Sequence, residues 1–344
     1  MTPSCSASPS WRPSGRWSGR CSPTSCTRRS TRACATTDGR AAPAPELAGR
    51  PPAVAAGEVP AGRSVWRLVL DVFLENRLAI AGLAIVVAMV LFCFVGPLIY
   101  RTDQIHVMLD QASKPPSGAH PLGTDDTGRD MLGRLMLGGQ TSLEVGLAAA
   151  VIATFFGALW GAVAGFTGGA VDSLMMRFVD GLLAIPSLFL LLFLASVLTT
   201  SVPMLILVVA LISWLAPARL VRGETLSLRG LDYVHAVRVM GSRGPWRAIL
   251  RHIIPNTVGT IVVNVTFQIA DAILIVATLS FLGLGVRPPS ANWGSLLSDG
   301  VTYTANGYWW LVYPPGVAIV LTVVAFNFIG DALRDGLSAR LRVR

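Results

Sequence analysis

The feature that this sequence most lacks is charge. Of its 344 residues only 14% are charged, whereas 52% are apolar, and the mean hydropathy is +0.58. A soluble domain usually carries about 25% charged residues. The composition therefore argues against an ordinary soluble protein and predicts a membrane protein.

Lysine is nearly absent, and a phosphate-binding loop is absent altogether. The only lysine, Lys114, follows Ser113 and precedes two prolines, so the pattern Gly-x-x-x-x-Gly-Lys-[Ser/Thr] does not occur. That loop is the usual means of cradling ATP phosphates. We therefore expect no cofactor in this chain, and any ATP-driven activity would need an ATPase on another polypeptide.

Catalytic and metal-binding patterns are missing as well. The four histidines form no metalloprotease pair: His106, His120, His235 and His252. The nucleophile motif Gly-x-Ser-x-Gly does not occur. Four cysteines precede residue 35, the fifth is Cys93, and no Cys-x-x-Cys spacing is present. We therefore predict neither an enzyme, nor a zinc site, nor a disulfide framework.

The first 62 residues are rich in Ser, Arg, Pro and Ala and show no apolar period. Such a segment buries too little apolar surface to offset its ordering entropy, so we predict disorder. It also lacks the apolar run of a secretory signal peptide. Two interpretations compete: a basic cytoplasmic tail, or sequence ahead of a mis-called start codon.

Six apolar runs follow, and each is a candidate membrane span. The runs cover 78–100, 143–166, 181–198, 202–220, 258–284 and 309–329. At about 1.5 Å per residue, the first of them crosses roughly 30 Å of hydrocarbon. We expect an amphipathic helix over 63–77 before the first span and a polar loop over 101–140 after it. Proline removes a helical hydrogen bond, which predicts a kink at Pro186 and a break near Pro217.

The arginines predict the orientation. With six spans, both termini lie on the same side as the loop 221–256, which is the most basic of the chain. Its arginines are Arg222, Arg229, Arg238, Arg243, Arg247 and Arg251. The positive-inside rule places this side in the cytoplasm. Because the arginines lie at the ends of apolar runs, the net charge of +9 requires no nucleic-acid partner. We expect three parts, covering 1–62, 63–140 and 141–344.

The loop 221–256 contains a basic segment with a regular pattern. Apolar side chains recur in it at three- and four-residue steps: Tyr233, Val234, Val237 and Met240. That spacing predicts a short amphipathic helix, which Gly241 ends. A second amphipathic segment over 246–254 leads to Pro255. The pattern fits a lever for a soluble partner and equally a loop that only fixes topology.

The second apolar run carries Gly157, Gly161 and Gly165, which recur every fourth residue. Such a stripe of small residues lets another helix approach closely. The alternative is ordinary glycine usage in membrane helices. Three glycines in register favour packing.

Asp271 is the one acidic residue deep within an apolar run. A carboxylate in that position is a functional candidate, for a cationic substrate group or for proton relay. The alternative, which we favour, is a hydrogen-bonded group that packs two helices. A functional Asp271 would suit a secondary transporter with a proton or cation site, although the sequence shows no inverted repeat.

Several segments resemble the membrane subunits of bacterial ATP-binding-cassette importers. The cytoplasmic loop motif of that family is Glu-Ala-Ala-x-x-x-Gly, and this chain matches it at Ala236 and Gly241 but departs from it at His235 and Val237. The segments HPLGTDDTGRDMLGRLMLGG (120–139), LSFLGLGVRPPSANWGSLL (279–297) and FNFIGDALRDGLSARLR (326–342) resemble the dipeptide, oligopeptide and nickel branch, specifically its C-type permease subunit. The resemblance covers about 66–344, which favours a mis-called start for the tail.

This resemblance implies an all-α membrane protein with six transmembrane helices and the type I importer permease fold. It implies that residues 231–241 form a coupling helix seated on a separate ATPase. In that helix Tyr233, Val237 and Met240 would supply apolar contacts and Arg238 a polar one, while Pro255 would fix entry into the fifth span. The implied substrates are dipeptides, oligopeptides or nickel chelates. The implied partners are a second permease subunit, two ATPase subunits, an extracytoplasmic substrate-binding protein and membrane lipid.

The outer loop of such a subunit would face the binding protein. Asp125, Arg129 and Asp130 could therefore shape a docking surface. The alternative, which we prefer, is local folding through aspartate caps and a salt bridge from Arg129. Aromatic residues near the last span are expected to anchor it at the membrane interface: Trp293, Trp309, Trp310, Tyr303, Tyr308 and Tyr313.

Overall fold

The computed structural model describes residues 65–198, 201–231, 249–286 and 290–342. The description below concerns the unit formed by residues 59–344. The predicted tail over 1–62 lies outside the described residues. Within the described ranges the only regular elements are helices, apart from a single β-bridge between Thr124 and Asp130. The all-α prediction is confirmed.

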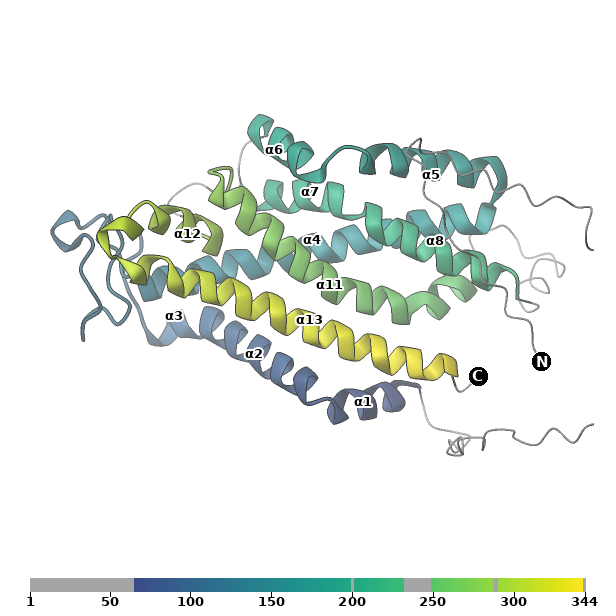
Figure 1. Cartoon of the computed structure of the whole chain (residues 1–344), viewed down its shortest axis with the longest axis horizontal. Coiled ribbons are helices and arrows are strands. Elements are labelled where there is room, and N and C mark those ends of the chain that lie inside the picture. The colour runs from purple at the N-terminus through teal and green to yellow at the C-terminus, as the bar shows by residue number, and fades with distance from the viewer. Residues whose placement is uncertain (1–64, 199–200, 232–248, 287–289, 343–344) are drawn as a thin grey trace, which may run out of the picture. The chain divides into compact units, whose positions relative to one another are not determined.

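The helices are labelled in Figure 1. In chain order they are α1 (Val65–Glu75), α2 (Arg77–Phe94), α3 (Gly96–Ile99), α4 (Met131–Thr167), α5 (Gly169–Leu183), α6 (Ser187–Val197), α7 (Val202–Ser213), α8 (Leu215–Arg229), α11 (Ile254–Phe281), α12 (Trp293–Val301) and α13 (Tyr313–Arg342). The described residues also include four single turns: Leu109–Gln111, Thr304–Asn306 and Trp309–Leu311 are 3₁₀, and Ile249–Ile253 is a π-helical turn.

Four helical segments of the described chain are long and apolar enough to cross a membrane. They are Arg77–Ile99, Met131–Thr167, Ile254–Phe281 and Trp309–Leu337. Two further pairs qualify only together: α5 with α6, bent by 80°, and α7 with α8, bent by 42°. The described chain therefore has four spans, or six if each bent pair is one span. A polytopic membrane protein is confirmed.

The start of α4 differs from the sequence prediction. This helix begins at Met131, so the predicted outer loop over 101–140 is wrong in its last ten positions (131–140). Glycines made this segment look like a loop, but they serve close packing. A Cβ atom at Gly139 would lie only 2.3 Å from Sγ of Cys93 and 2.7 Å from the ring of Trp293. The helix is capped by Asp130, whose side chain accepts a hydrogen bond from the Gly133 amide at 2.9 Å.

Both predicted proline bends are confirmed. Pro186 lies at the junction of α5 and α6. The break in the fourth span falls at Trp214, close to the expected Pro217. Because Pro217 has no N–H, it cannot donate to the carbonyl of Ser213, four residues earlier. The side chain of Gln268, from α11, donates to that carbonyl instead at 2.8 Å.

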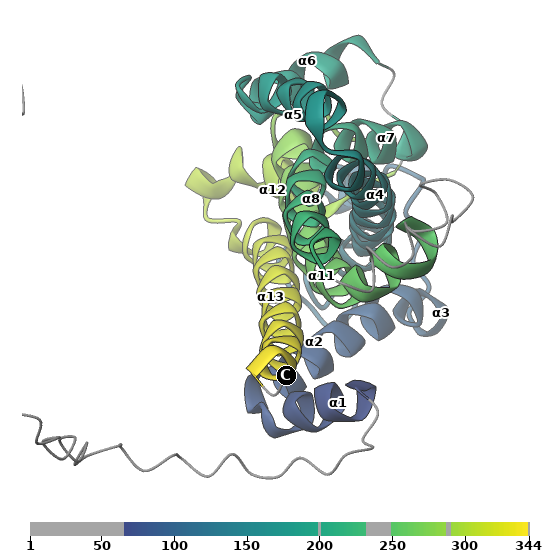
Figure 2. The ribbon, with the colours of Figure 1, turned by 90° about the vertical axis from the view of Figure 1, so that its right-hand side faces the viewer.

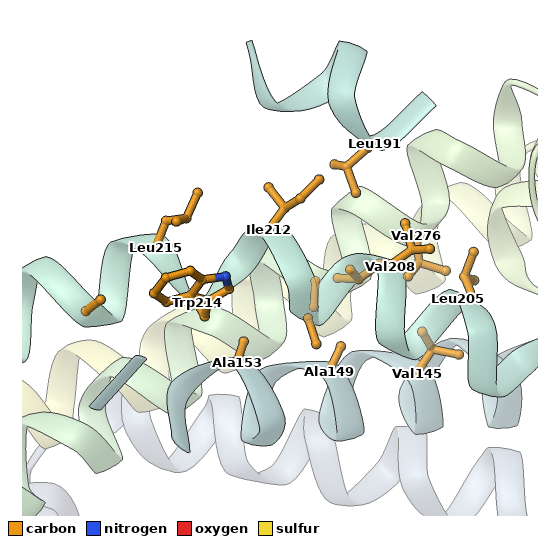
Figure 3. Packing of buried hydrophobic residues seen from close by; sticks show 14 of the residues in the cluster. Val145, Ala149, Ala153, Leu191, Leu205, Val208, Ile212, Trp214, Leu215 and Val276 are labelled. Atoms are coloured by element: carbon orange, nitrogen blue, oxygen red, sulfur yellow. The ribbon is translucent and has the colours of Figure 1, made fainter. Parts of the chain in front are cut away.

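The largest hydrophobic core lies between α4, α6, α7 and α11. Figure 3 shows Val145, Ala149 and Ala153 of α4 directed toward α7, while Leu191 of α6 approaches from the other side. The small alanines let the two helices lie close together. Elsewhere α2 packs along α13, and α1 lies against the end of α13 (Figure 2).

The aromatic residues near the last span do not all lie where the sequence suggested. Trp293 is 0% exposed and Trp310 is 6% exposed, whereas Trp309 and Tyr313 are exposed. The indole N–H of Trp293 donates to the carbonyl of Leu135 at 3.0 Å. Interfacial anchoring is therefore wrong for Trp293 and Trp310, which belong to a second core formed by α2, α4, α11, α12, the turn Trp309–Leu311 and α13.

Candidate coupling site and intramembrane polar groups

The predicted coupling helix lies outside the described residues, between α8 and α11. This applies to Tyr233, His235, Ala236, Val237, Arg238, Met240 and Gly241. Pro255 is described and lies in the first turn of α11. A proline fits there because the first N–H groups of a helix have little need of an intrahelical acceptor. What the structure does describe is how both ends of this loop are held.

The leading end of the loop is held through close packing of α8 on α4. A Cβ atom at Gly157 would lie 2.5 Å from the carbonyl oxygen of Trp214, and one at Gly161 would lie 2.3 Å from that of Ala218. At Gly165 the nearest atom would be Cβ of Thr225, at 2.8 Å. The glycine stripe therefore brings two backbones together, and the packing prediction is confirmed.

Ion pairs also fasten α8 to α5. Arg222 makes a two-pronged contact with Asp172, from Nε to Oδ1 at 2.5 Å and from Nη2 to Oδ2 at 2.7 Å. Arg219 pairs with Asp180 nearby. Bidentate arginine–carboxylate contacts hold both distance and orientation. These ion pairs were not visible in the sequence, because Arg222 and Asp172 are 50 positions apart in the chain.

Arg229, the last residue of α8, donates from Nη1 to the carbonyl of Gly165 at 3.2 Å. The guanidinium also occupies the space beside Gly168, where φ is +67° and a Cβ atom would lie 2.2 Å from Nη1. Only a glycine combines that left-handed backbone with such a close neighbour. The loop therefore departs from a firmly held helix end.

The trailing end of the loop is held by buried isoleucines. Ile249 and Ile253, from the π-helical turn that precedes α11, are 1% and 0% exposed. They form one cluster with Ala158 and Ala162 of α4 and with Val221 of α8. Both ends of the loop are thus packed against α4, and the trailing end also contacts α8.

In the segment that follows the first span, Asp130 joins three parts of the chain. Besides capping α4, it accepts a hydrogen bond from the hydroxyl of Tyr100 at 3.0 Å. Its Oδ2 also lies 2.8 Å from Nδ1 of His120. No sequence pattern indicated the histidine, because the contact depends on how the loop folds back. Burial and the hydrogen bond to Asp130 raise the pKa of Tyr100 to about 12.

Asp125 has a similar role. Its side chain accepts from the backbone amides of Thr127 at 2.9 Å and Arg129 at 2.7 Å. Its ion pair is with Arg134 at 3.4 Å, while Arg129 donates to the carbonyl of Ile105 at 3.3 Å. Local folding through aspartate caps is confirmed, but Arg134 supplies the ion pair that we expected from Arg129. Arg134 lies on α4, in the stretch that the sequence suggested was loop.

A further acidic group lies next to this loop, on α12. Burial raises the pKa of the Asp299 carboxyl, the nearby charges of Asp126 and Asp125 raise it further, and Arg134 opposes them. The charge of Asp126 is also the main cause that raises the pKa of Tyr303. Within the described residues, no group of three His, Cys, Asp or Glu side chains is placed to hold a metal ion.

Asp271 lies on an exposed face of α11. No hydrogen bond or ion pair joins its side chain to any described residue. The helix-packing role that the sequence favoured is therefore not supplied by the described part of this chain. Asn264 lies seven residues, or about two turns, earlier on the same face.

Comparison with known proteins gives the family. Residues 157–343 match the family described as binding-protein-dependent transport system inner membrane component. Residues 64–116 match the N-terminal TM domain of oligopeptide transport permease C.

Individual relatives agree. The oligopeptide transport system permease protein OppC of Bacillus subtilis is 38% identical over 279 residues, covering 81% of this chain and 91% of its own length. OppC of Escherichia coli K12 is 39% identical over 284 residues, 82% of this chain and 93% of its own. The dipeptide transport system permease protein DppC of B. subtilis is 37% identical over 268 residues, 78% and 83% of the two chains. These relatives are transport permeases and not enzymes. The chain belongs to the family of inner membrane components of binding-protein-dependent transport systems.

Proposed function

We propose that this chain is a permease subunit of an ATP-driven importer of dipeptides and oligopeptides, or of nickel chelates, and that it forms half of the translocation pore. The relatives named as oligopeptide and dipeptide permeases support the substrate class. Its proposed partners are a second permease subunit, two ATPase subunits and an extracytoplasmic binding protein. ATP is used by the partner subunits, since this sequence has no phosphate-binding loop.

In this proposal the chain crosses the inner membrane six times, with both termini in the cytoplasm. The two bent helix pairs support the count, because each pair is long and apolar enough to serve as one span. The arginine-rich loop 221–256 supports the orientation. On the outer side, the buried Asp125 and Asp130 hold the loop on which a binding protein would dock.

The observation that carries the coupling proposal is the anchoring of residues 232–248 at both ends. Bound to an ATPase, that segment would pull on α8 through Arg229 and on α11 through Ile253. Both helices pack on α4, so a displacement of the loop would be passed to the membrane-spanning helices as a unit. Motion is transmitted well by packed elements and poorly by loose chain.

The rival, a secondary transporter that uses Asp271, has less support. The chain has a single carboxylate deep in an apolar run, and none of the relatives named above is described as such a transporter. The two functions differ in their energy source, so one experiment separates them.

Reconstitute the complete complex in proteoliposomes with its binding protein and measure uptake of a radiolabelled tripeptide. We expect uptake that requires ATP on the ATPase side and that persists when proton and sodium gradients are abolished. Uptake that follows an imposed gradient without ATP would establish the rival. An empty proteoliposome and a complex with an ATPase that cannot hydrolyse ATP are the controls.

A further inference from the structure

A cavity of about 450 Å³ lies over α11, between α8 and α13. In Figure 1 these three helices lie side by side, with α11 in the middle. Binding pockets for small molecules are usually about 300–1,000 Å³ and mostly apolar, with a few placed polar groups. The apolar lining includes Leu220, Val263 and Phe267, and the polar lining includes Glu224, Asn264 and Arg334.

Two oxygen atoms in the cavity wall lack a hydrogen-bond partner among the described residues. They are Oε2 of Glu224 and Oδ1 of Asn264, and both are buried. The other carboxylate oxygen of Glu224 accepts from the hydroxyl of Thr260, which fixes the orientation of the side chain. Buried acceptors without donors are rare and costly in folded proteins. Both unsatisfied groups accept hydrogen bonds, so the missing ligand must donate them.

An ammonium group meets this requirement, because it carries three donors and a positive charge that complements Glu224. The same cavity is lined by Arg334 of α13, whose guanidinium suits a carboxylate. One carboxylate and one guanidinium in an otherwise apolar cavity form a template for a molecule with both charges. The free ends of a short peptide have that chemistry.

We propose that this cavity binds a short peptide, with its α-ammonium group on Glu224 and Asn264 and its terminal carboxylate toward Arg334. This inference rests on the proposed function and adds a recognition site within the permease itself. The site lies on the same face of α11 as Asp271, about two turns closer to the helix start.

A phospholipid with an ammonium headgroup offers related chemistry, but the headgroup would not lie as deep in the membrane as the cavity does. Asn264 is ten residues into α11, so at about 1.5 Å per residue it lies roughly 15 Å from the helix start. A headgroup would stay near the membrane surface. A transported peptide can reach further in.

The test uses the whole complex in nanodiscs, without nucleotide and without binding protein. Equilibrium binding of radiolabelled Ala-Ala-Ala is compared with binding of N-acetyl-Ala-Ala-Ala, which lacks the ammonium group, and of the C-terminal amide, which lacks the carboxylate. Each blocked end is expected to weaken binding by about tenfold or more, because each removes a charge-assisted contact.

Two variants test which side chain binds which end of the peptide. Glu224→Gln is expected to abolish the effect of acetylation and keep that of amidation, whereas Arg334→Gln is expected to do the reverse. Matched controls are Asp180→Asn and Arg219→Gln, which remove the same charges from an exposed ion pair that does not line the cavity. Both controls are expected to keep both effects.

If Glu224→Gln stays fully sensitive to acetylation, or if no peptide binds, the site is refuted. Binding lost when phosphatidylethanolamine replaces phosphatidylglycerol in the nanodisc would show that a headgroup occupies the cavity, which also overturns the proposal. Peptide uptake is measured on the same preparations. If the complex imports peptides but the variants bind peptide like the wild type, only this site is refuted. If the complex imports no peptide, the proposed function is refuted.

Discussion

At the scale of single residues, the pairing of Pro217 with Gln268 shows how a membrane helix tolerates a break. Proline leaves the Ser213 carbonyl without its helical donor, and no water is available within a bilayer to replace it. The amide of Gln268, which is 7% exposed, fills that position from a neighbouring helix. The bend of the fourth span and its contact with α11 are thereby linked.

We predict that Gln268→Leu destabilises the complex by about 1–3 kcal/mol, the usual cost of a buried polar group left unpaired. Pro217→Ala restores an N–H that can donate to Ser213, so the double variant is expected to recover most of the loss. The melting temperatures of the four proteins in detergent form a double-mutant cycle. Equal losses for Gln268→Leu with and without Pro217→Ala would contradict this account.

The buried carboxyl of Asp299 predicts a pH dependence of stability. Its pKa is raised above the ordinary value of 3.8 in the folded protein, so folding favours its protonated form. The stabilisation is present below the ordinary pKa and is lost as the pH rises through the raised value. At neutral pH the ionised carboxylate therefore lowers stability.

The substitution Asp299→Asn removes this cost and is expected to raise the melting temperature at pH 7. The advantage over the wild type should shrink as the pH falls toward 3.8, where the wild-type carboxyl is protonated. The exposed Asp110 provides a control, since Asp110→Asn should change little at either pH. If the Asp299→Asn protein melts below the wild type at pH 7, the charge of Asp299 is needed and this account is wrong.

At the scale of helices, glycines of α4 let its backbone lie directly against the backbone of α8. A Cβ atom at Gly161 would meet the Ala218 carbonyl and, at 2.8 Å, the amide of Arg222. Both neighbours are backbone atoms, so neither can rotate away. One added methyl group must push the two helices apart.

We predict that Gly161→Ala destabilises the complex by about 1–3 kcal/mol, as overpacking usually does. Gly223 on α8 is the matched control because nothing lies within 4 Å of its Cβ position. Gly223→Ala should be neutral or stabilising by up to about 1 kcal/mol, since alanine favours helix more than glycine does. Thermal unfolding measures both, and equal effects at the two positions would argue against the close contact.

The sequence predicted those features that depend on local chemistry. The glycine stripe at Gly157, Gly161 and Gly165 and the bends at Pro186 and Pro217 follow from the properties of glycine and proline alone. The error over 131–140 has a different origin. Gly139 in that stretch faces Cys93 and Trp293, which lie far away in the sequence, so the pattern could not distinguish close packing from a loop.

The candidate sites also divide into features visible in the local sequence and features that depend on the fold. The motif around Gly241 was visible in the sequence, whereas the contact of Arg222 with Asp172 that fastens the preceding helix was not. The cavity of Glu224, Asn264 and Arg334 combines three helices. No local pattern indicates that these three side chains share one cavity, so only the fold could reveal it.

At the scale of the whole molecule, the described residues form helices that include the membrane spans, and both ends of the basic loop 221–256 are fastened to α4. In the proposed importer that loop is the route by which ATP hydrolysis on another subunit reaches the pore. The central claim is therefore that residues 231–241 couple the two subunits.

The most direct test replaces Gly241, which the sequence predicts to end the coupling helix, by valine. A turn that needs positive φ would be strained by on the order of 1–3 kcal/mol. Ser242→Val is the control, because it adds a similar bulk beside the glycine without replacing it. In purified complexes we measure ATPase co-purification, substrate-stimulated ATP hydrolysis and peptide uptake together.

We predict that Gly241→Val preserves membrane insertion and pairing with the second permease subunit, because the strain falls outside the spans. ATPase association, or the link between hydrolysis and uptake, should fail, whereas Ser242→Val should retain both. If co-purification, hydrolysis and uptake of the Gly241→Val complex all equal those of the unmutated complex, this loop is not the coupling element and the account is contradicted.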